Sequence, residues 1–549
     1  MQDWRRAGMK VQETENGFVP VIDYLRRSAV NFPQRPAFVG PEEISYEQFY
    51  AMVRRWAGYF RYAGLQPGDR VAIWLPKQID YVVALYAAME CGGVYVPMDG
   101  MQPVERAKKI FTGAEPAILV TDSARFEQLD DATCASLRLA LVTDFHKVPD
   151  AAAPGRFAVA SRASADTFEP PSEQTPHHPG PQDLAAILFT SGSTGMPKGV
   201  QISYGNLHAF IGWALQELSL NERDVFSNHA GFHFDLSTFD LFAAAAAGAG
   251  VWVIGEEQQR DVAALADGIQ RYDVSVWYSV PSILSLMVSA GALDTDVTAS
   301  LCYLIFAGEV FPIRPLRELS QRLPGDCALY NFYGPTETNV CLYYRVTAED
   351  LQRDKPVYIG APLPGQNALV LDDQGLPVST PGAIGELIIE GSCVTPGYRN
   401  RVDPANADNH LQGRHATGDL VGYENGYLYY HGRKDRMLKI NGYRVELGEI
   451  EAALSTMPGI REIAVVAEIT EQAQNLIAYF SAVDPASAPS VLAIKQHCQT
   501  RLPRYMIPKL VRRLDELPKS RNGKIDYLAL KELAFKPNVA PQTHTDPVA

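Results

Sequence analysis

Residues 188–200 (LFTSGSTGMPKGV) combine hydroxyl side chains, glycines and one lysine directly after an apolar run. The run itself, residues 184–189 (LAAILF), predicts a short buried strand bounded by turn signals. Because glycine removes the steric cost of unusual dihedrals, we expect residues 191–199 to form an irregular loop. The backbone N–H groups of such a loop, its hydroxyls and Lys198 would together cradle a polyphosphate.

The spacing within this loop differs from that of the Walker-type NTPases. Gly192, Gly195 and Lys198 are three residues apart, which does not match the pattern GxxxxGK[ST]. Taken alone, the stretch leaves one alternative open, a mobile Gly/Ser-rich surface loop.

Composition and charge limit the class of protein. The chain has 549 residues, 46% hydrophobic and 20% charged, which is typical of a soluble protein with two or more domains. A net charge of −14 argues against a nucleic-acid partner, which needs clustered positive charge. Seven scattered cysteines without CxxC spacing indicate reduced thiols, a cytoplasmic location and no cysteine metal site.

No membrane segment is expected. The N-terminus lacks the apolar core of a signal peptide. The longest apolar stretch, residues 241–254, is too short to span a bilayer and predicts a buried helix that turns into a strand.

The elements that must position the loop alternate along the chain. Residues 147–183, rich in Pro, Ala, Ser and His, are interpreted as a solvated excursion. From about Gly432, a charged turn, a short strand and an amphipathic helix open a segment long enough for a small α+β domain. Short apolar runs between helical patterns predict α/β layers with parallel sheet, and they cover residues 70–75, 116–121, 139–144, 250–255, 274–279 and 302–308.

Three further motifs place polar residues at turns. NFYGPTETNV (331–340) has a Gly-Pro turn before Thr336 and Glu337, ATGDL (416–420) contains Asp419, and KSRNGKID (519–526) contains Lys524. Taken in order with the phosphate loop, they resemble the adenylate-forming superfamily of amino-acid adenylation domains, acyl-CoA synthetases and luciferases. The resemblance covers nearly the whole chain through ten motifs: SYEQF (45–49), CGGVYVPMD (91–99), the phosphate loop, FDLS (234–237), NFYGPTE, GELIIEG (385–391), TGDL, GRKDRMLKINGYRVELGEIE (432–451), LPRYMIP (502–508) and NGKID (522–526).

The resemblance implies an α/β fold in two domains. It implies a large N-terminal core of layered α/β subdomains over residues 1–434, and a small mobile α+β lid over residues 435–535. The lid would turn about a hinge at Asp435. Residues 536–549 are expected to be a disordered tail, because they contain few apolar groups.

The resemblance also implies a reaction, in which a carboxylate joins the α-phosphate of ATP and pyrophosphate leaves. Two anions must meet, so the site must neutralise charge and hold an in-line geometry. Lys524 is implied to bridge the substrate carboxylate and the developing charge at phosphorus, Glu337 to bind Mg²⁺ and Thr336 to contact the α-phosphate. Asn331 and Tyr333 are implied to contact the adenine, one by hydrogen bonding and one by stacking. The other implied ATP-binding residues are Thr190, Ser191, Gly192, Ser193, Thr194, Gly195 and Lys198 for the phosphates, Asp419, Tyr430 and Arg433 at the ribose, and Gly308, Glu309, Phe332 and Gly334.

Asp235 indicates the class of carboxylic acid. In this family an aspartate at that place resembles the binder of an α-ammonium group, and a buried carboxylate needs such a positive partner. A helix N-cap is the alternative role for Asp235. Aligning the motifs implies a side-chain pocket formed by Asp235, Leu236, Phe239, Tyr278, Ile305, Ala307, Phe332, Val340, Cys341 and Lys524.

This pocket is small and apolar away from its charged ends. It is similar to the pocket of prolyl-carrier-protein ligases, which start pyrrole-forming pathways, but it departs at Ile305 and Phe332, where leucines are expected. L-proline is therefore the expected substrate. Alanine, serine and azetidine-2-carboxylate are the alternatives, because Phe332 narrows the pocket.

The expected acceptor is the phosphopantetheine thiol of a separate, acidic carrier protein. No carrier module follows Lys524, and residues 501–526 hold eight Lys/Arg against three Asp/Glu, which suits either a docking surface or a solvated face. Coenzyme A is the alternative acceptor. A sensor that binds an adenylate without turnover is the alternative function. A chain that had lost its activity would be expected to lack Lys524, Glu337 or Lys198, and all three are present.

Overall fold

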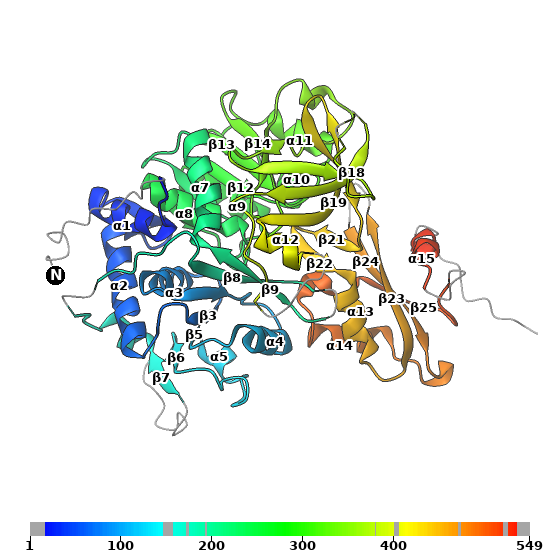
Figure 1. Cartoon of the computed structure of the whole chain (residues 1–549), viewed down its shortest axis with the longest axis horizontal. Coiled ribbons are helices and arrows are strands. Elements are labelled where there is room, and N and C mark those ends of the chain that lie inside the picture. The colour runs from blue at the N-terminus through cyan, green and yellow to red at the C-terminus, as the bar shows by residue number, and fades with distance from the viewer. Residues whose placement is uncertain are drawn as a thin grey trace, which may run out of the picture. The chain divides into compact units, whose positions relative to one another are not determined.

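The computed structural model describes residues 17–145, 157–171, 175–192, 195–378, 380, 382–399, 406–469, 474–519 and 525–534. The chain forms two compact units (Figure 1). The larger comprises Met1–Thr190 and Pro197–Asp435, and the smaller comprises Ser191–Met196 and Arg436–Ala549. Most of the predicted phosphate loop therefore groups with the smaller unit.

A nine-stranded sheet carries most of the expected site residues. Six neighbouring strands run parallel, and the strand next to them on each side pairs antiparallel with them. On one side a further short strand pairs antiparallel with its neighbour. The carboxyl ends of parallel strands meet at one edge, where ligands of α/β sheets bind. In spatial order the strands are β16 (Ala361–Pro362), β15 (Leu342–Arg345), β14 (Ala328–Tyr333), β13 (Tyr303–Ala307), β12 (Val276–Ser279), β10 (Val225–Asn228), β11 (Gly250–Val253), β1 (Pro36–Val39) and β2 (Ile44–Ser45).

A seven-stranded sheet holds the start of the phosphate loop. Its strands are parallel except for the final antiparallel pair, which flanks the loop. In spatial order they are β7 (Ala158–Ser161), β6 (Leu139–Val142), β5 (Ile118–Thr121), β3 (Arg70–Trp74), β4 (Val94–Pro97), β8 (Leu184–Thr190) and β9 (Lys198–Ser203). Every apolar run predicted as a strand is a strand of these two sheets.

One sequence interpretation is wrong in part. Residues 147–183 were expected to form a solvated excursion, yet this segment supplies β7 at the edge of the seven-stranded sheet and α6 (Arg162–Asp166) after it. The side chain of Trp56 donates a 2.7 Å hydrogen bond to Asp166, which anchors α6 to helix α2 (Tyr46–Tyr62). The Pro-rich composition hid the short strand Ala-Val-Ala-Ser.

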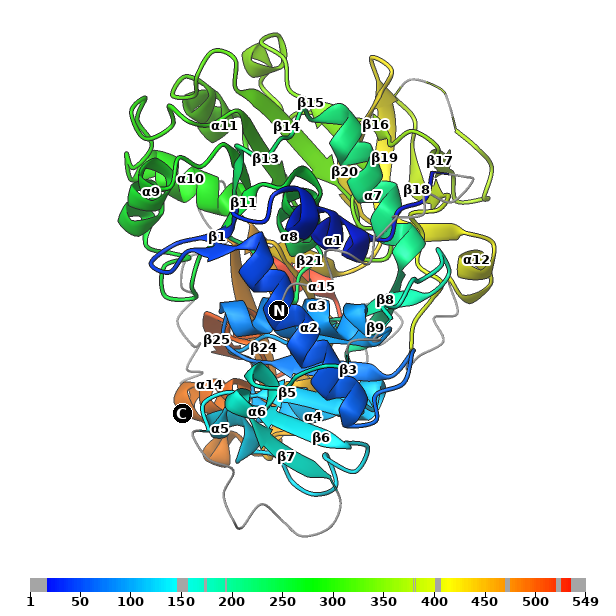
Figure 2. The same ribbon diagram turned by 90° about the vertical axis from the view of Figure 1, so that its left-hand side faces the viewer.

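Helices cover both sheets, and Figure 2 shows α1, α2 and α7 on the side that faces the viewer. The predicted helix-to-strand turn near residue 248 is confirmed, because α8 ends at Gly248, whose φ of 74° suits glycine, and β11 follows. The remaining helices of the larger unit are α1 (Val21–Asn31), α3 (Ile79–Glu90), α4 (Val104–Ala114), α5 (Ser123–Phe126), α7 (Tyr204–Glu217), α8 (Leu236–Ala247), α9 (Val262–Arg271), α10 (Pro281–Ser289), α11 (Ile313–Ser320), η1 (Asp350–Gln352) and α12 (Ala407–Leu411).

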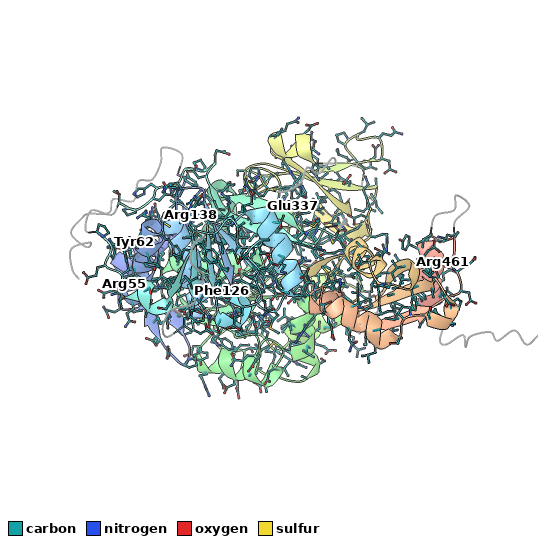
Figure 3. The ribbon with its side chains drawn as sticks, turned by 90° about the horizontal axis from the view of Figure 1, so that it is seen from below. Arg55, Tyr62, Phe126, Arg138, Glu337 and Arg461 are labelled. Atoms are coloured by element: carbon teal, nitrogen blue, oxygen red, sulfur yellow. The ribbon has the colours of Figure 1, made fainter. Side chains whose placement is uncertain are left out.

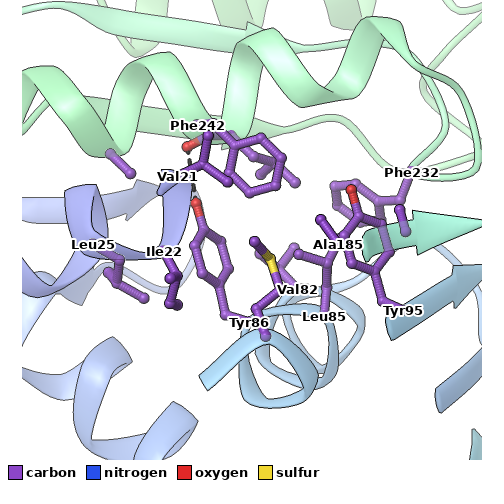
Figure 4. Close-up of a cluster of buried hydrophobic side chains, with 14 of the residues drawn as sticks. Val21, Ile22, Leu25, Val82, Leu85, Tyr86, Tyr95, Ala185, Phe232 and Phe242 are labelled. Carbon is purple, nitrogen blue, oxygen red and sulfur yellow. Dashed lines mark hydrogen bonds between the residues drawn. The ribbon is translucent and has the colours of Figure 1, made fainter. Parts of the chain in front are cut away.

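The core between these layers contains the helix that bears Asp235. Figure 4 shows Val21, Ile22 and Leu25 of α1 near Tyr86 of α3 and Phe242 of α8. The Tyr86 hydroxyl donates a 3.1 Å hydrogen bond to the carbonyl of Leu241, so even the polar atom of this buried ring is satisfied. The packing fixes α8 against α3.

A four-stranded antiparallel sheet completes the larger unit. Its order is β17 (Asn367–Leu371), β18 (Ile384–Glu390), β19 (Arg414–Glu424) and β20 (Tyr427–Arg433). Asp419 and Arg433 are paired across β19 and β20.

The smaller unit is α+β, as predicted. The single strand expected after Gly432 is instead a hairpin, because Asn441 and Gly442 both adopt positive φ and form a two-residue turn. The elements are β21 (Met437–Ile440), β22 (Tyr443–Glu446), α13 (Leu447–Ser455), β23 (Ile460–Ile469), β24 (Gln474–Ala482), η2 (Pro485–Ser487), α14 (Val491–Gln499), η3 (Arg504–Met506), β25 (Leu510–Arg513) and α15 (Tyr527–Ala534). In neither unit does a helix within the described ranges have the length and apolarity to cross a bilayer.

Candidate active site

The phosphate loop connects two paired strands. Thr190 at the end of β8 lies opposite Lys198 at the start of β9, so the loop begins and ends at one place. The Thr190 hydroxyl is buried and makes no hydrogen bond within the part of the chain that the structure describes, which leaves it available to a phosphate oxygen. Gly195 has a φ of 78°, which suits glycine in the turn. Ser193 and Thr194 lie outside the described residues.

Two donors of the loop have partners in the smaller unit. The backbone N–H of Gly192 donates a 3.2 Å hydrogen bond to Glu449, and the Ser191 hydroxyl donates a 2.8 Å hydrogen bond to the carbonyl of Arg444. Glu449 is buried, and its carboxylate supplies an anionic oxygen to the loop backbone. The loop therefore already binds an anion with an N–H group of the kind expected to cradle phosphate.

Glu337 follows β14, and none of its surface is exposed. Figure 3 labels it among the side chains of the larger unit. The Tyr398 hydroxyl donates a 2.7 Å hydrogen bond to Oε1, and His415 Nε2 lies 3.9 Å from Oε2. The neighbouring Thr336 is half-buried. One oxygen of the carboxylate thus accepts a hydrogen bond and the other lies near a histidine, and neither partner was predicted from the sequence.

Glu337 offers magnesium a single carboxylate, so phosphate oxygens of the nucleotide would have to supply further ligands. Within the described ranges, no group of three or more His, Cys, Asp and Glu side chains is arranged to hold a metal. Mg²⁺ is commonly bound by one or two carboxylates together with substrate phosphates, so a single buried carboxylate fits such a site. Lys198 Nζ lies 5.7 Å from the ring centre of Tyr398, so the phosphate-loop lysine and Glu337 are both neighbours of one tyrosine side chain.

Asp419 joins three of the predicted nucleotide contacts. The Tyr333 hydroxyl donates a hydrogen bond to Oδ2, and Arg433 Nη1 donates one to Oδ1. Burial, and then the charge of Asp419, raises the pKa of Tyr333 well above its usual value, so the hydroxyl remains a donor. Each carboxylate oxygen keeps lone-pair capacity for a ribose hydroxyl. Tyr430 is half-buried on the neighbouring strand.

The predicted adenine contacts, Asn331 and Tyr333, lie at the end of β14, and the predicted cofactor-binding residues Gly308 and Glu309 follow β13. The Asn331 amide donates a 2.8 Å hydrogen bond to the carbonyl of Tyr358, and Glu309 accepts a 3.0 Å hydrogen bond from the N–H of Ser282. Gly308 has a φ of 88°. At Gly334 a Cβ would lie 1.5 Å from the carbonyl oxygen of Asn339, so only glycine permits this turn before Thr336.

Three aromatic rings of the predicted amino-acid pocket come from separate elements. Phe239, Tyr278 and Phe332 contact one another edge-to-face, with ring centres 5.6 to 6.2 Å apart. Ile305, Ala307 and Val340 share their apolar cluster, and Leu236 packs against it. Cys341, which was predicted to line the pocket, belongs instead to a different apolar cluster together with Tyr333.

Asp235 precedes the first turn of α8, but its side chain does not cap the helix. The carboxylate is half-buried. Burial, and then the charges of Asp235 and Asp240, raises the pKa of Tyr278 well above its usual value. Asp235 therefore lies close enough to the aromatic pocket to influence it electrostatically.

Two statements about the C-terminal part, the role of Lys524 and the basic docking segment, stay predictions. Lys524 lies outside the described residues. In the basic segment 501–526, Arg512 donates hydrogen bonds to Tyr479 and to the carbonyl of Leu533, and Lys519 pairs with Glu462. Part of the positive charge is thus used within the smaller unit.

Comparison with known proteins supplies the family. The sequence profile of the AMP-binding enzymes matches residues 25–399, and that of the AMP-binding enzyme C-terminal domain matches residues 449–524. An L-proline–[L-prolyl-carrier protein] ligase of Streptomyces coelicolor is 47% identical over 516 residues, which cover 93% of this chain and 96% of the relative. A ligase of the same name from Pseudomonas fluorescens is 36% identical, over 92% of this chain and 97% of its own. Among solved structures, the Vibrio cholerae adenylation domain AlmE in complex with glycyl-adenosine-5′-phosphate matches with a TM-score of 0.78 at 23% identity, over 94% of this chain and 97% of that chain, which supports the fold.

Proposed function

Because this chain belongs to the AMP-binding enzyme family, we propose that it activates L-proline with ATP and transfers the prolyl group to a separate carrier protein. The observation that carries this proposal is the cluster of three buried aromatic rings at the predicted pocket, with the charge of Asp235 acting on one of them. Its rings come from α8, β12 and β14, and they leave an apolar environment for a compact side chain. The 47% identical prolyl-carrier-protein ligase supports the choice of proline.

The first step joins the amino acid to the nucleotide. A carboxylate oxygen of proline attacks the α-phosphorus of ATP, the bond from that phosphorus to the bridging oxygen breaks, and pyrophosphate leaves with the electron pair. Thr190 and Lys198 would bind the departing phosphates, while Asp419 and Arg433 hold the ribose side. Lys524 would offset negative charge at phosphorus.

Magnesium would add its charge at the phosphates. In this proposal Glu337 is its protein ligand, and the metal neutralises phosphate oxygens when bound. The chain itself supplies the orientation of that carboxylate through Tyr398 and the residues behind it.

The second step forms a thioester. The thiol of a carrier-bound phosphopantetheine attacks the prolyl carbonyl, the thiol proton is lost, and AMP leaves. We propose that Asp435 is the hinge about which the C-terminal lid turns between the two steps. An acidic carrier would suit the basic segment 501–526. The seven cysteines are free thiols, in keeping with a cytoplasmic enzyme.

Amino-acid-dependent exchange of pyrophosphate into ATP tests the substrate. We would measure it across the twenty amino acids, azetidine-2-carboxylate and pipecolate, and then follow prolyl loading of a phosphopantetheinylated carrier by intact mass. We expect proline to give the fastest exchange. Faster exchange with alanine, serine or azetidine-2-carboxylate would show that proline is not the substrate. Loading of coenzyme A instead of a carrier would show that the acceptor is misassigned. Binding without exchange would indicate a sensor.

A further inference from the structure

Two buried histidines lie behind the carboxylate of Glu337. His415 of β19 and His410 of α12 are 3% and 6% exposed. Nε2 of His410 lies 3.0 Å from Nδ1 of His415, and the two rings stack with a 23° angle between their planes. On its other side His415 places Nε2 3.9 Å from Oε2 of Glu337.

The contact between the two rings restricts where hydrogens can lie. A hydrogen bond between His410 Nε2 and His415 Nδ1 needs one N–H and one lone pair. If His415 supplied the N–H in its neutral form, its Nε2 would turn a lone pair toward the carboxylate, which is repulsive. If His410 supplies it, His415 carries its hydrogen on Nε2 and directs that N–H at Glu337. The negative carboxylate favours a hydrogen on Nε2 of His415, which the second arrangement provides.

The other oxygen of the same carboxylate is held independently. Tyr398 donates to Oε1, and its ring packs edge-on against His410 with ring centres 5.4 Å apart. The backbone carbonyl of Glu337 also accepts a 2.7 Å hydrogen bond from the N–H of Thr395. Oε1 and the backbone carbonyl of Glu337 are therefore held by hydrogen bonds, and Oε2 lies within ion-pair distance of His415.

We propose that His410 and His415 are positioning residues that orient the Glu337 carboxylate for the divalent cation of MgATP. His415 directs its Nε2–H at the carboxylate, and His410 holds His415 in the tautomer that permits this. The inference rests on the proposed role of Glu337 as the magnesium ligand. Residues that hydrogen-bond a metal ligand typically change metal affinity by about 10- to 100-fold when they are lost.

The test compares two substitutions at His410. His410→Gln places an amide N–H where Nε2 donates, whereas His410→Phe keeps a flat ring of similar size and removes the donor. Calorimetry on the full chain would give the Kd of ATP with excess Mg²⁺ and with EDTA. The Kd with EDTA divided by the Kd with Mg²⁺ reports how much the metal strengthens ATP binding. We expect His410→Phe to reduce this ratio about tenfold and His410→Gln to keep it within about threefold of wild type.

Two controls separate the possible failures. Glu337→Gln should abolish the effect of Mg²⁺ on ATP affinity, and if it does not, the proposed metal role of Glu337 is wrong. If Glu337→Gln does abolish it but the two His410 variants behave alike, the histidines only pack and the inference is overturned. Thermal unfolding checks that each variant folds. Should His410→Phe not fold, His415→Phe replaces it, and an unchanged ratio there overturns the inference equally.

Discussion

The hydroxyl of Tyr398 and the carboxylate of Glu337 are joined by a 2.7 Å hydrogen bond between segments 61 residues apart in the chain. The ring of the same tyrosine lies beside Lys198 Nζ. One side chain therefore connects the residue expected to bind the metal with the lysine expected to bind the phosphates.

Tyr398→Phe should weaken the use of MgATP without affecting the amino acid. The substitution removes only the hydroxyl, and a hydrogen bond to a charged group contributes about 1.5–3 kcal/mol. We expect the KM for MgATP to rise at least about tenfold in pyrophosphate exchange, with the KM for proline unchanged. Tyr62→Phe is the matched control, because that side chain is 75% exposed. Equal increases in both KM values would show a general disturbance of the site.

The sequence predicted the residues that lie inside regular motifs and missed those that only folding brings together. Tyr333, Glu337 and Asp419 stand in short motifs that were readable from the chain. The first two lie at or just after the end of β14, whereas Asp419, expected after a glycine turn, lies within β19. Tyr398, His410 and His415 stand in no such pattern. They surround Glu337 because β9, β19 and the turn after β14 meet in the fold. The spacing of residues along the chain does not predict such a contact between distant segments.

The fold shows the same division. Apolar runs predicted the parallel strands, since buried strands need continuous apolar residues. The hairpin of β21 and β22 was readable in the Asn-Gly pair at 441–442 but was interpreted as one strand. Lys77 was not singled out, yet its ammonium is buried and donates to the carbonyls of Asn228 and His229, and burial lowers its pKa to about 7.

His229 should make the protein less stable in mild acid. Burial, and then the charge of Lys77, lowers its pKa to about 4, while a hydrogen bond of 2.9 Å to the carbonyl of Gln259 opposes this effect. The unfolded chain, with a pKa near 6.5, binds the proton more readily, so this stability is present above that pH and is lost as pH falls toward 4. We expect a loss of about 2 kcal/mol between pH 7 and pH 5.

Urea unfolding at the two pH values measures this loss. His229→Gln retains an N–H for Gln259 but does not titrate, so its pH dependence should be smaller by that amount. His431→Gln, at an exposed histidine, is the control. An identical pH dependence in wild type and His229→Gln would exclude the effect.

Lys524→Ala should separate the two half-reactions. If the ammonium stabilises charge at phosphorus, adenylation should fall about 10²–10³-fold, the loss expected for one electrostatic donor. Thioester formation from supplied prolyl-AMP should change far less. Single-turnover measurements of each step decide this, and equal losses in both would reject the assignment.

Asp235→Asn tests recognition of the ammonium. The carboxylate lies beside the aromatic pocket, and its loss would leave a buried positive charge without its partner. We expect kcat/KM for proline to fall by the equivalent of about 3–5 kcal/mol. Asp267→Asn is the control, since that side chain is 62% exposed on α9. A small effect, with activity on an aryl or fatty acid, would show that the substrate class is misassigned.

Phe332→Leu tests how the pocket sets the size of its substrate. The Phe332 ring is fully buried and contacts Phe239 and Tyr278 on the pocket side, and Trp213 with ring centres 5.3 Å apart. Exchanging it for leucine removes ring volume while keeping an apolar side chain. Proline exchange should be kept or improved, and pipecolate, which has one more methylene, should be admitted. Because one methylene in a hydrophobic pocket is worth about 1–3 kcal/mol, the ratio of pipecolate to proline kcat/KM should rise about 10- to 200-fold.

Phe38→Leu, at a buried phenylalanine on β1, controls for loss of core packing. If both variants lose activity alike and neither changes the ratio, Phe332 serves the core and does not set the substrate.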